Sequence, residues 1–184
     1  MRYPPEHKDE TRGKIVRAAA AAFRKHGVNG IGVAQLMKGA KLTHGGFYAH
    51  FDSKEALVAE AIDAAFDQTM ASLEASIEAA PATGRQQAVL DGYVTRKHRD
   101  RPDAGCAIAA LGPEVSRLEA STRRRFESRV EGLVGLIAGE HADAETRASA
   151  VRTLAMMVGG MVMARAVRSE AFSQEILEAV RDAD

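Results

Sequence analysis

The stretch LTHGGFYAHFDSK, residues 42–54, joins a glycine-bearing aromatic segment to the start of another helix. Just upstream, residues 33–39 have the composition of a short helix that ends on a glycine. We therefore predict two short helices, over 33–39 and 43–50, joined by a tight turn. A shared apolar cluster would hold them at the steep angle of a helix-turn-helix. The expected members of this cluster are Leu36, Met37, Phe47 and Phe51.

The polar sides of these two helices would face outward together, as DNA binding requires. Thr43 is placed to cap the second helix, because its hydroxyl can accept a hydrogen bond from a backbone N–H two or three residues on. Glycines here lower the helix propensity by roughly 1 kcal/mol each relative to alanine, yet they let the backbone approach the wall of a groove. The exposed residues are expected to be His44, Gly45, Gly46, Tyr48 and His50.

The end of the same stretch predicts a third helix, over 54–79, capped by Asp52 or Ser53. Lys54 falls in its first turn, where the helix dipole disfavours a cation. A DNA phosphate would resolve that conflict, since helix N-termini and lysines are both common phosphate contacts. Tyr48 is a further candidate for such a contact. The simpler alternative, an amphipathic turn whose aromatic residues only pack, does not explain the whole ordered set.

Residues 10–62 resemble the DNA-binding domain of the tetracycline-repressor (TetR) family of bacterial transcription regulators. ETRGKIVRAAAAAFRKHGVNGIGV resembles the family's first helix and the entry to its second, and AKLTHGGFYAHFDSKEALVAEAI resembles the turn, the recognition helix and the next helix start. The resemblance implies an all-α protein with an N-terminal three-helix helix-turn-helix DNA-binding head, 1–54, and a larger helical ligand-binding and dimerisation body, 55–184. The candidate DNA-binding residues are Val33, Thr43, His44, Gly45, Gly46, Phe47, Tyr48, His50 and Lys54.

Two positions depart from the family pattern. At Gly32 and Val33 the family often places a serine or threonine that caps the second helix and touches phosphate. A glycine can still cap, but that side-chain contact is lost. Lys41 stands where the family usually has a glycine in the turn, so we expect a positive backbone φ there, at some energetic cost.

Charge is divided unequally along the chain, although its formal net charge is zero. Residues 1–54 hold ten Lys or Arg and four Asp or Glu, which gives +6, and residues 55–184 hold fifteen and twenty-one, which gives −6. A basic head attracts a polyanion by releasing its counterions. Solubility alone would explain the amounts of charge but not their segregation.

Length and composition set broad limits. At 184 residues and 46% hydrophobic content, the chain can bury a substantial core. The apolar run at residues 18–22 is too short for a signal sequence or a membrane span, so we expect a cytoplasmic protein that does not associate with membranes. A single cysteine excludes an internal disulfide framework.

That cysteine lies in the second informative segment, HRDRPDAGCAIAALGP, residues 98–113. Pro102, Gly105, Gly112 and Pro113 bracket a short helical piece that begins at Cys106. A helix N-terminus and nearby cations favour the thiolate form of a cysteine. The cations close in sequence are Arg96, Lys97, His98, Arg99 and Arg101. Cys106 is thus a candidate sensor of oxidants or electrophiles; the alternative is a small buried hydrophobe, the usual fate of a free cysteine.

Periodicity predicts helices through the rest of the body, over 85–99, 113–138, 144–167 and 172–180. The last two resemble the pair that forms a four-helix bundle with a second TetR subunit, which implies a homodimer. Gly159 and Gly160 would let another helix approach closely. A monomeric core, or methionines around a ligand pocket, are the alternatives.

We expect a homodimeric regulator, more specifically a repressor, that inserts residues 43–50 into successive major grooves of a palindromic double-stranded operator. A small-molecule or electrophile inducer would release it, either in the body cavity or by modifying Cys106. The candidate ligand residues are Phe66, Met70, Tyr93, Ile108, Phe126 and Met157, together with Cys106.

Neither a catalytic constellation nor a metal-ligand spacing is evident in the sequence, so we expect no enzyme activity, no metal and no cofactor. Two rival functions remain. One is a thiol-dependent helical enzyme in which Cys106 turns over. The other is a helical interaction module that does not bind DNA, which the departures at Gly32 and Lys41 keep open.

Overall fold

The computed structural model describes residues 5–80 and 84–183, and the regular structure in these ranges is helical, as predicted. In the labels, η marks a 3-10 helix. The elements are α1 (Pro5–His26), α2 (Val33–Gly39), η1 (His44–Ala49), α3 (Lys54–Ala79), α4 (Arg85–Tyr93), α5 (Arg96–Asp100), η3 (Pro102–Ala104), α6 (Ala107–Val115), α7 (Ala120–Ala138), α8 (Ala144–Ala166) and α9 (Glu170–Arg181).

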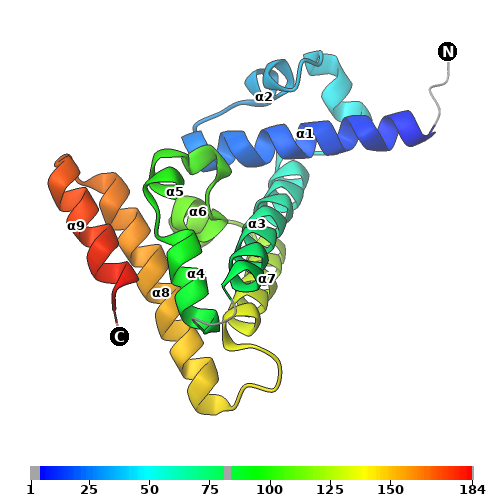
Figure 1. Ribbon diagram of the computed structural model, residues 1–184. Coiled ribbons are helices and arrows are strands. Elements are labelled where there is room, and N and C mark those ends of the chain that lie inside the picture. Colours follow the sequence, from blue (N-terminus) through cyan, green and yellow to red (C-terminus); the bar gives the residue numbers. More distant parts are fainter. Residues whose placement is uncertain (1–4, 81–83, 184) are drawn as a thin grey trace.

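The helices form a small head on a larger body (Figure 1). In the head, α1 lies across one end of α3 and carries α2 and η1 on its outer side. In the body, α3, α4, α7 and α8 pack together, and α9 lies along α8 at the edge. One hydrophobic core runs through both parts, from Ile15 in α1 to Leu177 in α9. The head is therefore not free of the body.

The first and third helices provide the frame of the head. Helix α1 buries Ile15, Ala19 and Phe23 on one side and stops where Gly27 takes a φ of 77°. Helix α3 begins where predicted, because the Ser53 hydroxyl accepts a hydrogen bond from the N–H of Ala56 at 3.1 Å. The prediction of a helix over 54–79 is confirmed.

The second helix of the predicted helix-turn-helix, η1, is shorter and tighter than expected. Residues 43–50 were expected to be an α-helix capped by the Thr43 hydroxyl, but η1 is a 3-10 helix without a side-chain cap. The N–H of Gly46 donates instead to the backbone oxygen of Thr43 at 3.1 Å. This turn already satisfies the N–H that a cap would serve. Two adjacent glycines disfavour the α-helical alternative.

The departures from the family pattern are placed as expected. Helix α2 covers Val33–Gly39, with Gly32 as its N-cap residue and no side-chain cap bond. Lys41 has a φ of 60°, in the region that favours glycine. The turn between α2 and η1 therefore keeps its shape with a lysine in place of a glycine.

Two predicted helix boundaries in the body are wrong. Residues 85–99 are not one helix: α4 ends at Tyr93, and Thr95 starts α5 by accepting a hydrogen bond from the N–H of His98 at 3.1 Å. Residues 113–138 are not one helix either, because α6 continues past Pro113 to Val115 and α7 begins at Ala120. Proline is tolerated there because the N–H that it lacks is only one bond in the last turn of a short helix.

The last two helices pack closely on each other. An added Cβ at Gly160 would lie 2.6 Å from Cγ2 of Val180, so a glycine is required for α9 to approach α8. An added Cβ at Gly159 would meet nothing within 4 Å. The close approach predicted for this glycine pair thus serves the chain's own α9 at one of the two positions.

Candidate functional site

The head presents a surface whose shape is set by a buried aromatic cluster. Leu36, Met37, Phe47 and Phe51 are all buried, as predicted. The rings of Phe47 and Phe51 stack with centroids 5.6 Å apart. Phe47, a candidate DNA-binding residue, is 1% exposed, so its role in the free protein is to fix η1 rather than to face a partner.

The outward face of η1 is exposed. His44, Gly45 and Tyr48 lie on the surface, and Gly46 is half-buried. Tyr48 is 65% exposed, the largest value among the large apolar side chains that stand out of the described structure. Its ring forms edge-to-face pairs with the rings of Phe47 and His44, with centroid distances of 5.2 Å and 6.3 Å, respectively. A large aromatic side chain is therefore held outward by a rigid base.

The predicted contact at the start of α3 already has a partner within the protein. Lys54 Nζ donates to the backbone oxygen of Ile31 at 2.8 Å, just before α2. This bond lets the ammonium lie in the first turn of α3 despite the helix dipole. Val33, at the start of α2, is half-buried and packs on the core.

An arginine that sequence reasoning missed holds η1 against the frame of the head. Arg12 of α1 donates to the backbone oxygen of His50, forms an ion pair with Glu60 of α3 and lies 4.2 Å from the centre of the Phe51 ring. These partners are distant in sequence, so no local pattern marks Arg12. Its position fixes the end of η1 relative to both long helices.

His50, the last of the predicted contact residues, is half-buried. Burial lowers its pKa, and the nearby charges of Lys8 and Arg12 lower it further. Its Nδ1 is buried and has no hydrogen-bond partner among the described residues. The ring therefore lies next to two cations and has a buried nitrogen whose hydrogen-bonding capacity is unused in the described structure.

A cavity of about 320 Å³ in the body contains Cys106. It is lined by Gln68, Thr69, Ser72, Leu73, Gly92, Tyr93, Thr95, Lys97, His98, Arg101, Ala104, Gly105 and Cys106. Cys106 is a free thiol, 1% exposed, and it is the N-cap residue of α6, at the helix start where it was predicted. The Tyr93 hydroxyl lies beside it, and burial followed by the Cys106 thiol raises the pKa of Tyr93 well above its usual value.

Only some of the predicted ligand residues belong to this cavity. Tyr93 and Cys106 line it, whereas Phe66, Met70, Ile108, Phe126 and Met157 do not. The rings of Phe66 and Phe126 meet edge to face at 5.2 Å, and Phe66 and Met157 are fully buried. Apolar residues at helical spacing thus form the core itself, and the cavity is lined mostly by polar residues between α3, α4 and α5.

The basic side chains near Cys106 differ from those predicted. His98 does contact it, since the Cys106 N–H donates to His98 Nε2 at 3.0 Å. Arg99 and Arg101 instead pair with Glu170 and Asp103, respectively. Two arginines from other helices reach Gly105, the residue before the cysteine: Arg24 donates to its backbone oxygen at 3.0 Å, and an added Cβ at Gly105 would lie 2.7 Å from Nη2 of Arg165.

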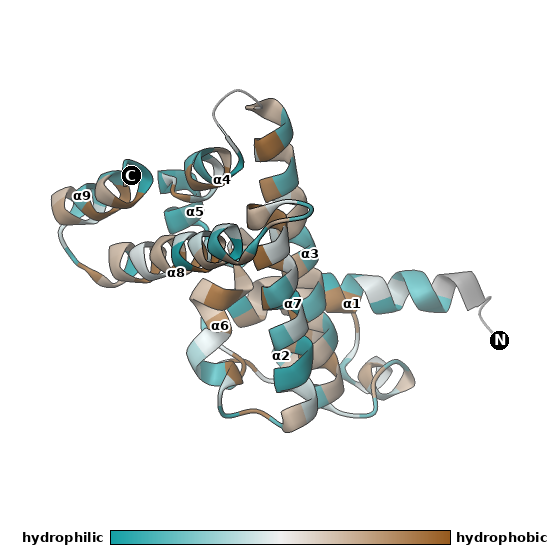
Figure 2. Ribbon diagram, turned by 90° about the horizontal axis from the view of Figure 1, so that it is seen from below, coloured by the Kyte–Doolittle hydropathy of each residue, from teal (hydrophilic) through white to brown (hydrophobic). Residues whose placement is uncertain are grey.

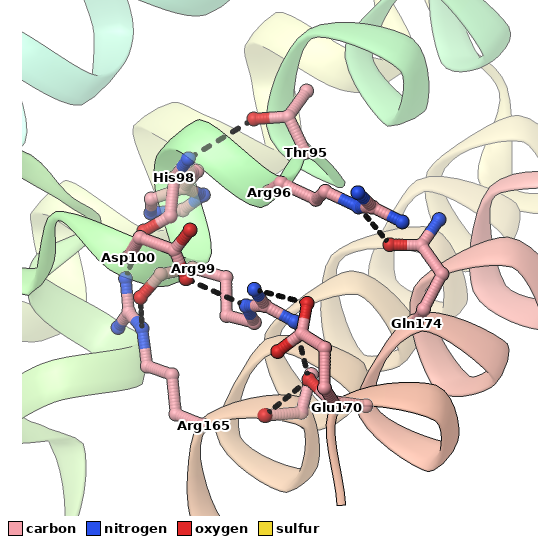
Figure 3. A network of polar contacts seen from close by, with 10 residues as sticks. Thr95, Arg96, His98, Arg99, Asp100, Arg165, Glu170 and Gln174 are labelled. Carbon is pink, nitrogen blue, oxygen red and sulfur yellow. Dashed lines mark hydrogen bonds and ion pairs between the residues drawn. The ribbon is translucent and has the colours of Figure 1, made fainter.

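Helix α5 is fastened to the end of the body by a polar network (Figure 3). Arg165 of α8 donates to the backbone oxygens of His98 and Arg99, at 2.6 Å and 3.1 Å. Arg99 in turn donates to Glu170 and to Ser173 of α9, both at 2.9 Å. This network links the wall of the Cys106 cavity to the last two helices.

Two contacts link the same region to the head. Arg24, near the end of α1, donates to the backbone oxygen of Gly105 at 3.0 Å and to Gln68 Oε1 at 2.7 Å. The Glu114 carboxylate of α6 accepts a hydrogen bond from the N–H of Val28 at 2.8 Å, directly after α1. A change in the cavity therefore has a short path to α1.

The buried ring of His98 predicts a pH dependence of stability. Burial, opposed by the hydrogen bond to the Tyr93 carbonyl, lowers the pKa of His98 to about 4. The ordinary value is about 6.5, so between these values the unfolded chain binds a proton that the folded chain does not. The free energy of unfolding is expected to fall by up to about 3 kcal/mol as pH drops from about 6.5 toward 4, and this group should cause no pH dependence above that window.

Urea unfolding at several pH values checks this expectation. The matched variant is His98→Gln, which keeps a polar side chain without the titration. Its unfolding free energy should vary less between pH 7 and pH 5 than that of the wild type. If the unfolding free energy of the variant fell equally steeply with pH, the proton uptake would belong to another group.

The outer side of α8 and α9 carries uncovered apolar side chains. Val151, Val162 and Met163 of α8 are 47%, 43% and 52% exposed, and Phe172 of α9 is 49% exposed. Helix α8 also buries Leu154, Met157 and Met161 on its inner side. Apolar and polar segments interleave along both helices at this edge of the molecule (Figure 2). Helix α8 is therefore apolar on two sides, and only the inner side is covered by the described residues.

None of the described helices has the length and apolar character needed to cross a membrane.

The chain is similar to proteins of one family. The sequence model of "Bacterial regulatory proteins, tetR family" matches residues 15–61. The A-factor receptor protein of Streptomyces griseus is 35% identical over 107 residues, which is 56% of this chain and 36% of that protein. The HTH-type transcriptional repressor KstR2 of Rhodococcus jostii (strain RHA1) is 28% identical over 133 residues, which is 68% of this chain and 63% of that protein.

The likeness in fold covers head and body together. The crystal structure of a TetR-family transcriptional regulator from Cytophaga hutchinsonii has a TM-score of 0.75 at 22% identity and covers 99% of this chain and 96% of that one. The matched sequence regions, by contrast, span less than two thirds of the length of both curated relatives.

Proposed function

Because the chain belongs to the tetR family of bacterial regulatory proteins, we propose that it is a homodimeric transcriptional repressor that binds a palindromic operator. The observation that carries this proposal is the exposed face of η1, with Tyr48 held outward on the buried Phe47. A repressor of chromosomal genes works in the cytoplasm. Its family is one of regulators rather than enzymes.

The proposed DNA contacts fall into two groups. His44, Gly45, Gly46 and Tyr48 would enter the major groove, where base edges can be read. Thr43, His50 and Lys54 would contact the phosphate backbone at the rim, which positions the head without reading sequence. Val33 and Phe47 would act by fixing these side chains. The head is proposed to be residues 1–54 and the body 55–184, with α3 shared in packing between them.

The proposed dimer joins the outer faces of α8 and α9 to those of a second copy. Gly159 of α8, where an added Cβ would meet nothing within 4 Å in the described structure, lies between apolar residues of the sequence that a partner helix can cover. Two heads related by a two-fold axis would then reach half-sites roughly 34–36 Å apart, or a multiple of that distance.

The proposed switch is the Cys106 cavity. A small molecule bound there, or an electrophile that modifies Cys106, would shift the wall around Gly105 and act on α1 through Arg24. Moving a two-state protein from mostly bound to mostly released needs about 5.5 kcal/mol of differential interaction. The proposal includes both routes of release, because Cys106 lines the cavity in which a ligand would bind.

Selection of binding sites from a random pool of DNA duplexes tests the proposed function. We expect the reduced protein to enrich an inverted repeat, and binding to that repeat to weaken after treatment with N-ethylmaleimide. A Cys106→Ser variant should bind equally well before and after treatment. Loss of binding in the treated variant would point to damage elsewhere, and no enriched sequence would favour a module that does not bind DNA.

A methyl group at Gly45 is expected to affect binding and stability differently. In the free protein an added Cβ at Gly45 would meet nothing within 4 Å. Gly45→Ala should therefore leave the free energy of unfolding unchanged or raise it by up to about 1 kcal/mol. If the backbone lies against a groove wall, operator affinity should fall about tenfold, a loss of about 1.4 kcal/mol.

The matched control for this variant is Gly132→Ala in α7, where an added Cβ also meets nothing within 4 Å. It should gain similar stability and keep full operator affinity. Fluorescence anisotropy of labelled operator and urea unfolding give the two readouts. Wild-type affinity in Gly45→Ala would contradict a close approach of η1 to the groove.

A further inference from the structure

The walls of the Cys106 cavity carry unused hydrogen-bond donors. Gln68 Oε1 accepts from Arg24 Nη2 at 2.7 Å, which orients the amide and leaves its Nε2 to donate elsewhere. Tyr93 is 2% exposed, and its hydroxyl has no oxygen or nitrogen partner in the described part of the chain, with only the Cys106 thiol, a weak hydrogen-bonding group, beside it. A buried hydroxyl without a partner is costly unless a ligand or water serves it. The cavity thus favours a ligand that accepts hydrogen bonds.

The charge around the cavity is positive. Lys97 and Arg101 line it, and Arg101 pairs with Asp103 at 3.0 Å. No aspartate or glutamate lines it within residues 5–80 and 84–183. His98 adds no positive charge near neutral pH, since burial lowers its pKa to about 4. The Lys97 ammonium is left as the lining cation without an acidic side chain beside it in the cavity.

Two guanidinium groups, those of the buried Arg24 and the half-buried Arg165, lie directly behind the wall at Gly105. Arg24 donates to the Gly105 backbone oxygen, and an added Cβ at Gly105 would lie 2.7 Å from Nη2 of Arg165. Their hydrogen bonds go to neutral oxygens, those of Gly105 and Gln68 for Arg24 and those of His98 and Arg99 for Arg165. Neither guanidinium is hydrogen-bonded to a carboxylate in the described structure, although the charge of Asp103 acts on Arg24. Removing a cation from water is unfavourable unless an anion compensates it, so an anion in the cavity would stabilise both.

We propose that this cavity binds a small organic anion, whose acidic group accepts hydrogen bonds from Gln68 Nε2 and the Tyr93 hydroxyl within the field of Lys97, Arg24 and Arg165. The volume of about 320 Å³ is at the lower end for small-molecule sites, so the ligand is compact. This assignment rests on the proposed function, because it names the chemical class of the inducer. It also brings the ligand into contact with Cys106.

A matched pair of alkylating reagents tests the charge preference without knowledge of the natural ligand. Iodoacetate and iodoacetamide react alike: the Cys106 sulfur forms a bond to the CH₂ carbon, iodide leaves, and the thiol proton passes to solvent. Because the chain has one cysteine, all thiol modification reports on this cavity. We expect the ratio of the iodoacetate to the iodoacetamide rate to be about tenfold higher in the folded protein than in the same chain unfolded in urea.

A charge variant and its control locate the effect. Lys97→Gln should lower the folded-state ratio several-fold, whereas Arg152→Gln, which removes a charge from the lining of a different cavity, should leave it unchanged. Benzoate should slow the iodoacetamide reaction, and benzamide at the same concentration should not. Inorganic phosphate in place of benzoate distinguishes a preference for a phosphate group from one for a carboxylate.

The proposal is overturned if the folded and unfolded chains give the same rate ratio, or if neither reagent reaches the folded thiol. Equal protection by benzoate and benzamide would also overturn it, because it would show a site without charge preference. Operator binding is measured separately on the untreated protein. A lost charge preference with intact operator binding removes only the anion assignment, and absent operator binding removes only the proposed repressor function.

Discussion

A Met163→Glu variant is expected to be a folded monomer that binds operator about 10²–10⁴-fold more weakly than the wild type. Met163 is 52% exposed on the outer side of α8, next to the similarly exposed Val162. A carboxylate at this position would be desolvated without a partner if the face were covered by a second subunit. One head without its symmetry mate then loses the gain in affinity from simultaneous binding to both half-sites.

Light scattering and circular dichroism check this expectation together. The particle mass should fall to that of a single chain, 19.7 kDa, while the helical spectrum stays the same. The matched control is Ser128→Glu, which adds a carboxylate to the exposed side of α7. An unchanged mass for Met163→Glu would exclude this face as the dimer interface, and a monomer with full operator affinity would contradict the paired-head proposal.

The parts of the fold that were predicted correctly depend on local chemistry. Helix α2 and helix α3 were found with the predicted bounds, because a glycine end and the Ser53 cap act within a few residues of the boundary. The φ of 60° at Lys41 was expected from the resemblance instead, since the family usually has a glycine at that position. The buried cluster around Phe47 followed from spacing alone, since residues on one face of two adjacent helices must meet.

The incorrect predictions fall where two local hydrogen-bonding arrangements compete for the same backbone groups. The Thr43 hydroxyl and the Thr43 carbonyl both suit the same N–H, and the 3-10 turn takes it. Between Tyr93 and Arg96 the apolar periodicity continues, but Thr95 caps a new helix and the Tyr93 carbonyl accepts a hydrogen bond from the His98 ring at 2.8 Å. Apolar periodicity does not detect a helix break of this kind, because the break is stabilised by hydrogen bonds of side chains.

Of the two candidate sites, one could be predicted from local sequence and the other could not. The exposed positions of η1 could be listed from sequence because the helix-turn-helix pattern is short and ordered. The cavity could not, because the two arginines behind its wall, Arg24 and Arg165, lie 81 and 67 residues from the backbone oxygens to which they donate. Phe66, one of the apolar residues predicted to bind ligand, is buried in the core and does not line this cavity. Helical spacing alone does not separate those two roles.

Arg24 is the residue whose replacement should disconnect the cavity from the head. It is 5% exposed, belongs to α1, and bonds both to Gly105 beside Cys106 and to Gln68 of α3. An Arg24→Met variant keeps a long side chain but loses both hydrogen bonds. We expect operator binding by the unmodified variant to remain close to that of the wild type, with a cost in stability of about 1–3 kcal/mol.

The large effect of Arg24→Met is expected on the release of operator DNA after Cys106 is alkylated. If alkylation of Cys106 weakens operator binding of the wild type about a hundredfold, within the usual range of coupling between sites, the same treatment of Arg24→Met should weaken it by less than about fivefold. The control is Arg129→Met, since Arg129 is also a partly buried arginine bonded to α3, through Asp67, but it does not contact the head. Anisotropy titrations before and after alkylation give the ratio. Undiminished release in Arg24→Met would assign the coupling to the remaining link, the Glu114 carboxylate and the N–H of Val28.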